Sequence, residues 1–205
     1  NLKEEDIDNY MQTLSEYFKK NEYHEPYDFW FDRQTEKIMN QLGTSYYSHK
    51  GFKNISLHTD LCSPIATKPT WGGLNKKQKS LLEKKGLKIW LDLMKILKPS
   101  VILISVDENK YLKPNNFVQI SKLKTNENLE NSFESKNVFK KHRKDGSFTS
   151  LDSKDIYLYK HESINNCKIY KGRNNSGIPF GNIAFKDSDI EVKHISELIL
   201  ASLCS

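Results

Sequence analysis

The fold is predicted from one stretch of the chain, Asn54-Ile55-Ser56-Leu57-His58-Thr59-Asp60-Leu61-Cys62-Ser63-Pro64. Ile55 and Leu57 alternate with Ser56 and His58, and this period of two indicates a strand. Polar and reactive side chains then follow one another until Pro64 ends regular structure. Because open α/β sheets place their binding sites at the carboxyl ends of strands, the same stretch is a candidate site.

A long helix and a second strand follow. Residues 76–97 carry apolar side chains at helical spacing behind Asn75, a good N-cap residue, and Gly86 leaves open a break into two helices. The predicted buried stripe consists of Leu82, Ile89, Trp90, Leu93 and Leu97. Residues 101–106 form an apolar run of strand length, typical of a strand buried on both faces of a parallel sheet. Strand 54–58, helix 76–97 and strand 101–106 therefore predict a βαβ unit and an α/β fold.

Local patterns predict the remaining elements. We expect helices over residues 4–20, 32–42 and 107–112, and a last helix that begins at Ser188 or Asp189. We expect strands over residues 117–123, 155–160 and 168–171. The polar and basic residues between them predict a loop or insertion over residues 124–150.

Composition limits the class of protein. The chain has 205 residues, of which 37% are hydrophobic and 28% charged, as in one globular domain with a core. No apolar run is long enough to span a bilayer, so we expect no membrane partner. The three cysteines are widely spaced, which predicts neither a disulfide framework nor a zinc site and favours a cytoplasmic protein. The net charge of +6 favours polyanionic partners.

Several side chains could carry chemistry or have ordinary structural roles. His58, Asp60 and Cys62 alternate, so a metal- or thiol-dependent hydrolase is conceivable, but no second ligand cluster accompanies them and we predict no metal. Asp60 could instead bind backbone amides of the Pro loop, and Cys62 could be a small buried residue. Tyr46 and Tyr47 could stack on a base or pack in the core. The basic residues within 76–88 and 136–144 could contact phosphates or form solvated surfaces.

Four segments occur in the order found in one enzyme superfamily. They are Phe29-Trp30 before a helix ending at Leu42-Gly43, the segment Leu57–Pro64, Lys98-Pro99 before Val101–Ser105, and Lys168–Gly172 before Ile178-Pro179-Phe180-Gly181. Over most of residues 27–199 the chain thus resembles the uracil-DNA glycosylase superfamily. The resemblance implies one domain over residues 1–205, a three-layer α/β/α sandwich with a short, mostly parallel central sheet. The superfamily's first motif, a strand ending in Gly-x-Asn-Pro or Gly-x-Asp-Pro, does not occur in residues 1–26. Either it lies upstream of Asn1, as we expect, or the protein lacks it.

The resemblance also implies a function. Such enzymes flip a base out of DNA and hydrolyse its N-glycosidic bond, without a cofactor. The implied catalytic candidates are Asp60 and His58, and the base-binding candidates are Thr59, Ser63, Tyr46 and Tyr47. Thr59 falls at the base-reading position, which is usually Asn. The DNA-binding candidates are Lys76, Lys77, Lys140, Lys141, Arg143, Pro179 and Phe180. The alternative is a non-catalytic nucleic-acid-binding or interaction protein of the same fold.

Overall fold

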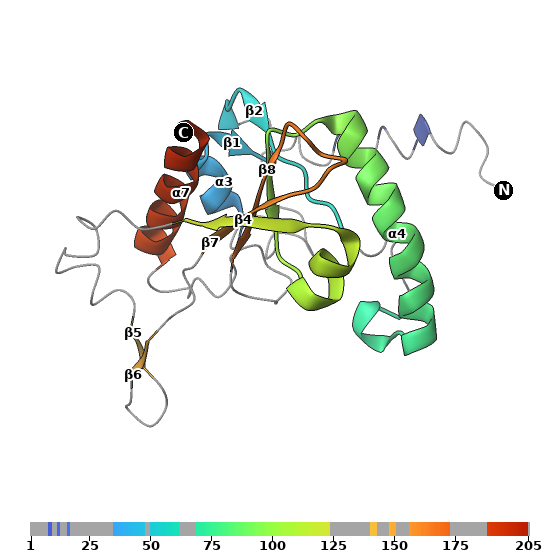
Figure 1. Ribbon diagram of the computed structural model, residues 1–205. Coiled ribbons are helices and arrows are strands. Elements are labelled where there is room, and N and C mark those ends of the chain that lie inside the picture. The colour runs from blue at the N-terminus through green and yellow to red at the C-terminus, as the bar shows by residue number, and fades with distance from the viewer. Residues whose placement is uncertain are drawn as a thin grey trace.

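The chain folds into helices and mixed sheets, so its class is α/β (Figure 1). The computed structural model describes residues 8, 9, 12, 16, 35–47, 50–61, 69–123, 140–142, 148–150, 156–172 and 188–204, with the backbone alone at 140–142, 148–150, 188–191 and 194. The described elements are, in order, α3 (Lys37–Gln41), β1 (Thr44–Ser45), β2 (Asn54–Ile55), η3 (Trp71–Gly73), α4 (Lys76–Leu97), β3 (Val101–Ile104), η4 (Glu108–Leu112), η5 (Lys113–Asn115), β4 (Val118–Lys122), β5 (Lys140–His142), β6 (Phe148–Ser150), β7 (Ile156–Lys160), β8 (Lys168–Gly172) and α7 (Ser188–Cys204).

Helix α4 begins and ends where the sequence predicts. The Asn75 side chain accepts a hydrogen bond from the Gln78 backbone N–H over 2.9 Å, and the Gln78 side chain accepts one from the Asn75 N–H over 3.0 Å. This reciprocal capping box satisfies two backbone donors at the helix start. At the other end, Lys98 adopts the left-handed conformation (φ 47°) and its N–H donates to the Met94 carbonyl. The helix is continuous through Gly86.

The buried side of α4 confirms the predicted stripe in part, because Trp90 is buried and Leu93 packs against the core. Gly86, Trp90 and Met94, spaced four residues apart, are buried. Ile89 is 51% exposed and Leu97 45% exposed, so these two members of the predicted stripe lie outside the core. Residues four apart lie on nearly the same side of a helix with 3.6 residues per turn. The buried side of α4 is therefore the row that contains Gly86, Trp90 and Met94, and Ile89 lies on a different side.

The main sheet has the order β3-β8-β7-β4. Strands β3 and β8 run parallel, with Ile102 opposite Ile169 and Ile104 opposite Lys171. The pairs β8–β7 and β7–β4 are antiparallel. The described strands therefore form a mixed sheet, not the mostly parallel one that was predicted. The reason is local, because the connection from Lys160 to Lys168 is too short for the crossover that parallel neighbours need.

The prediction of a buried strand over residues 54–58 is wrong. Only Asn54 and Ile55 form β2, which pairs in parallel with β1 in a separate sheet. Ile55 is 83% exposed and Leu57 is 64% exposed. Because β2 and β3 lie in different sheets, the predicted βαβ unit does not form within one sheet. Alternation indicates extended backbone, but burial requires a neighbouring layer that the alternation does not supply.

Two apolar clusters lie on the two faces of the main sheet. On one face, Ile169 and Tyr159 pack in a cluster with Trp90 and Met94 of α4. On the other face, Tyr170 packs in a cluster with residues of α3 and α7; that second cluster contains Ile38, Met39, Tyr46, Tyr47, Ile156, Val192, Ile195 and Ile199. Alternating residues of β8 thus face opposite sides, as the pleat of a strand requires.

Other local predictions have mixed outcomes. Strands β4, β7 and β8 and helix α7 confirm the elements expected near residues 117–123, 155–160, 168–171 and after 188. Helix α3 lies within the predicted 32–42 helix and is followed by Gly43 at φ +75°, a conformation that favours glycine. Within the predicted 124–150 loop, β5 and β6 pair as antiparallel strands. Of the predicted helix 4–20, only residues 8, 9, 12 and 16 are described, all as helix.

None of the helices in the described ranges is both long enough and apolar enough to cross a membrane.

Candidate functional site

The carboxyl ends of the parallel strands β3 and β8 bring charged and phenolic side chains together. Lys171, near the end of β8, lies opposite Ile104 of β3 and Tyr157 of β7. Its side chain is buried, with 3% exposure of the residue, and its Nζ donates to the Gly172 carbonyl over 2.8 Å. Asp107 and Glu108 follow β3 at the same edge. This edge is where open α/β sheets place their ligand sites.

The pKa values at this edge are perturbed. Burial lowers the pKa of the Lys171 ammonium group, while the charges of Glu108 and Asp107 act in the opposite direction. Burial raises the pKa of the Tyr159 hydroxyl, and the charge of Glu108 and a hydrogen bond to it raise it further. Side chains whose pKa values are shifted both by burial and by specific charged neighbours mark candidate functional sites. We call Asp107, Glu108, Tyr157, Tyr159 and Lys171 the strand-end cluster.

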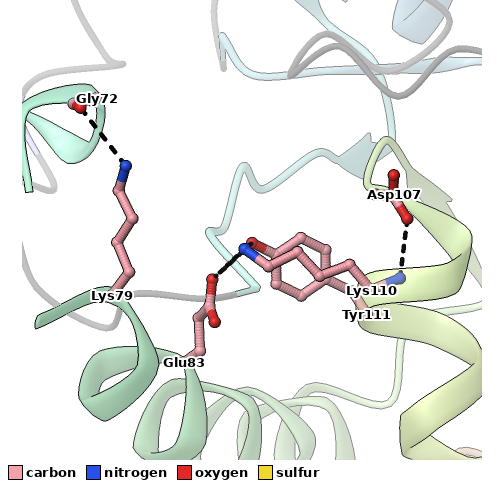
Figure 2. Close-up of polar contacts among 6 residues, drawn as sticks. All are labelled: Gly72, Lys79, Glu83, Asp107, Lys110 and Tyr111. Carbon is pink, nitrogen blue, oxygen red and sulfur yellow. Dashed lines mark hydrogen bonds and ion pairs between the residues drawn. The ribbon is translucent and has the colours of Figure 1, made fainter. Parts of the chain in front are cut away.

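A second group joins η4 to α4 close to this edge (Figure 2). Lys110 Nζ donates to Glu83 Oε1 over 2.7 Å and to the Tyr111 hydroxyl over 2.6 Å. The Tyr111 hydroxyl donates to the same Glu83 oxygen over 2.7 Å. Lys110 Nζ also lies 4.6 Å from the centre of the Tyr111 ring, as in a cation–π contact. The three side chains form a closed triangle of polar contacts.

The charges of this triangle stabilise one another. Partial burial acts to raise the pKa of Glu83, but the hydrogen bonds from Lys110 and Tyr111 and the charges of Lys110 and Lys79 lower it overall. The hydrogen bond to Glu83 is the largest cause of the raised pKa of Lys110. Asp107 caps η4 by accepting from the Lys110 backbone N–H over 2.8 Å. The triangle thus fixes the segment after β3 against α4 and keeps Glu83 ionised.

Glu36 is a buried carboxylate on the opposite face of the sheet. The residue is 1% exposed, and its carboxylate accepts hydrogen bonds from the Ser45 hydroxyl and, over 3.2 Å, from the Tyr46 N–H. Lys50 Nζ lies 3.7 Å away. These contacts satisfy the charge and tie the start of α3 to β1, which is a structural role.

Where the structure describes them, the residues predicted to bind a base contact other parts of the fold. Thr59 Oγ1 accepts a hydrogen bond from the Trp90 indole Nε1 over 3.0 Å, which holds the segment against α4. The neighbouring His58 and Asp60 are exposed. Ser63 lies outside the described residues. Tyr46 and Tyr47 are 7% and 3% exposed and belong to the core, the packing role that the sequence also allowed.

The structure describes some of the residues that were predicted to contact DNA. Lys76 and Lys77 are exposed in the first turn of α4. Lys140 and Lys141 lie in β5, where the backbone alone is described. Arg143, Pro179 and Phe180 lie outside the described ranges, as does Cys62 of the conceivable metal or thiol site. Within the described ranges, no three His, Cys, Asp or Glu side chains are grouped as a metal site requires.

Sequence reasoning missed the strand-end cluster. A lysine within the apolar pattern of β8 was the available signal, because lysine is almost never buried without partners. The partners come from the start of η4, which follows β3, and from β7, and the sheet order places them beside Lys171.

Comparison with protein-family models, with curated proteins and with solved structures finds no match to the chain.

Proposed function

We propose that the protein binds DNA through the lysines in the first half of α4. The observation that carries this proposal is the excess of exposed positive charge on the first half of α4. Lys76, Lys77, Lys84, Lys85 and Lys88 are exposed. Glu83 is the single carboxylate between Lys76 and Lys88, and it is paired with Lys110 of η4 over 2.7 Å.

This arrangement suits a polyanion with closely spaced charges. Each lysine that neutralises a phosphate releases condensed counterions, so the affinity depends steeply on salt. The net charge of +6 acts in the same direction. Contacts of this kind position a protein on the DNA backbone and carry no sequence information.

The layered architecture of the fold is part of the same proposal. We infer an α/β/α sandwich related to the uracil-DNA glycosylases. Three observations support it: α4 packs on one face of the main sheet, α3 and α7 pack on the other, and β3 and β8 run parallel. In such a fold, the segment from His58 to Asp60 would lie beside the DNA-binding helix.

The test is DNA binding measured by fluorescence anisotropy at several salt concentrations. We expect Lys84→Glu/Lys88→Glu to weaken binding to a labelled duplex and to reduce the slope of log affinity against log salt. The matched control is Lys53→Glu/Lys160→Glu, which changes the net charge equally at exposed positions outside α4. Equal weakening by both double variants would reduce the effect to net charge and refute the assigned surface.

Removal of a base is the second candidate function. It is favoured by Asp60, an exposed carboxylate next to Thr59, which Trp90 holds in place. A carboxylate can orient the water that attacks an N-glycosidic bond. Incubation with oligonucleotides that carry modified bases would test it. Base release that Asp60→Asn abolishes while DNA binding persists supports the enzyme. DNA binding without release from any oligonucleotide favours the non-catalytic protein.

A further inference from the structure

The outer side of α4 exposes large aliphatic side chains as well as lysines. Leu81 is 60% exposed, Ile89 51% and Ile96 77%. They are eight and seven residues apart, so they fall within an arc of about 80° around the helix axis, with exposed Lys85 and Asp92 between them. Exposed aliphatic side chains that gather on one surface mark an interaction site more often than scattered ones do.

A row of lysines runs beside these aliphatic residues. Lys77, Lys84 and Lys88 are exposed and are spaced by seven and four residues, which also places them along one side. The carboxylate of Asp92, the acidic residue on this part of the helix, is paired with Lys95 over 3.0 Å. The surface made of Leu81, Ile89 and Ile96 with Lys77, Lys84 and Lys88, which we call the outer face of α4, is therefore both aliphatic and cationic.

We propose that the outer face of α4 docks on the surface of an anionic lipid bilayer. A helix lying in the interface plane buries aliphatic side chains at the boundary between headgroups and acyl chains. Lysines beside them are attracted to anionic headgroups. The expectation of no membrane partner came from the lack of a spanning segment, and this contact requires none.

Other occupants account for fewer of these features. DNA phosphates, which we propose as ligands of these lysines, leave Leu81, Ile89 and Ile96 without a contact, so DNA binding by itself does not account for the aliphatic residues. A partner helix commonly lies in a groove between elements, whereas the outer face belongs to one convex helix at the side of the fold (Figure 1). A second copy of the chain would bring two lysine rows against each other. A bilayer matches both the shape and the charge of the surface.

The test is flotation of the full chain with vesicles at low salt. Phosphatidylcholine vesicles are compared with vesicles made of equal parts phosphatidylcholine and phosphatidylglycerol. We expect binding to the anionic vesicles alone, and a loss of about tenfold or more in Ile89→Glu/Ile96→Glu because two inserted side chains become charged. The control is Ile55→Glu, a change of the same kind at a residue that is 83% exposed on β2.

The variants also separate this surface from DNA binding. Ile89→Glu/Ile96→Glu should keep its thermal unfolding transition and should lose more vesicle binding than duplex binding. The neutral Ile89→Gln/Ile96→Gln, which adds no negative charge, should lose vesicle binding as well. The proposal is overturned if anionic vesicles do not bind the wild type, if Ile55→Glu causes the same loss, or if duplex binding falls as far as vesicle binding.

Discussion

The indole Nε1 of Trp90 donates a hydrogen bond to Thr59 Oγ1 over 3.0 Å and joins two segments 31 residues apart in the chain. Trp90 is 5% exposed and belongs to the core between α4 and the main sheet. The bond is therefore a direct link between the polar stretch His58–Asp60 and the helix that carries the exposed lysines.

Trp90→Phe tests this link. The change removes the N–H donor and part of the ring, and we expect unfolding to become easier by about 1–2 kcal/mol. Thr59→Val leaves a buried indole N–H without its acceptor and should cost about 1–3 kcal/mol. Urea unfolding of both variants and of the double variant measures the coupling. Strictly additive effects would mean that the two side chains do not interact in solution.

Glu83→Gln tests the triangle with Lys110 and Tyr111. The folded-state pKa of Glu83 is lowered, so the stability that Glu83 contributes is present above its ordinary pKa of 4.5 and is lost as the pH falls through the folded value. Because Lys110 is half exposed, we expect a loss of no more than about 1 kcal/mol near neutral pH. The free energy of unfolding of wild type and variant should converge in acid. A constant difference across the pH range would contradict this assignment.

His161 should make stability depend on mildly acidic pH. Burial lowers its pKa below the ordinary 6.5, its ring lies 4.6 Å from that of Phe117, and its Nδ1 accepts from the Ser163 N–H. The unfolded chain therefore binds a proton more readily, and the contribution to stability is complete above pH 6.5 and is lost as the pH falls towards the folded pKa. NMR titration should find the lowered pKa, and His161→Gln should remove this part of the pH slope. A titration at or above 6.5 would refute it.

Lys171 should destabilise the fold in a pH-dependent way. Its folded pKa is lowered from 10.5, so wild-type stability should rise as the pH increases from the folded value towards 10.5. Lys171→Met should lack this rise, and it should abolish DNA binding or base release only if the strand-end cluster contacts the ligand. Lys160→Met, at the exposed end of β7, controls for the loss of one positive charge. An identical pH profile for wild type and Lys171→Met would show that the lysine is not perturbed.

Local sequence patterns predicted the elements with local causes. Asn75 caps α4 because its side chain reaches the amide of Gln78 three residues on, and Gly43 follows α3 because it accepts a positive φ. The spacing of residues 155–160 and 168–171 likewise predicted β7 and β8. Of the candidate site, the sequence indicated the exposed polar residues His58 and Asp60 and the lysines of α4.

The sequence by itself therefore determined the net positive charge and the ends of those helices and strands whose signals are local. Tertiary structure alone decided that Ile89, Ile55 and Leu57 face solvent and that Tyr46 and Tyr47 lie in the core. It also decided that Lys171 meets the charges of Asp107 and Glu108, which are more than sixty residues earlier in the chain. Capping and turns depend on neighbours within a few residues, whereas burial and charge pairing depend on which strands and helices become neighbours in space. The opening stretch illustrates both: its extended backbone at β2 is local, but its place against α4 depends on the hydrogen bond from Trp90 to Thr59 and on Leu61, which is buried in a cluster with Trp90 and Met94.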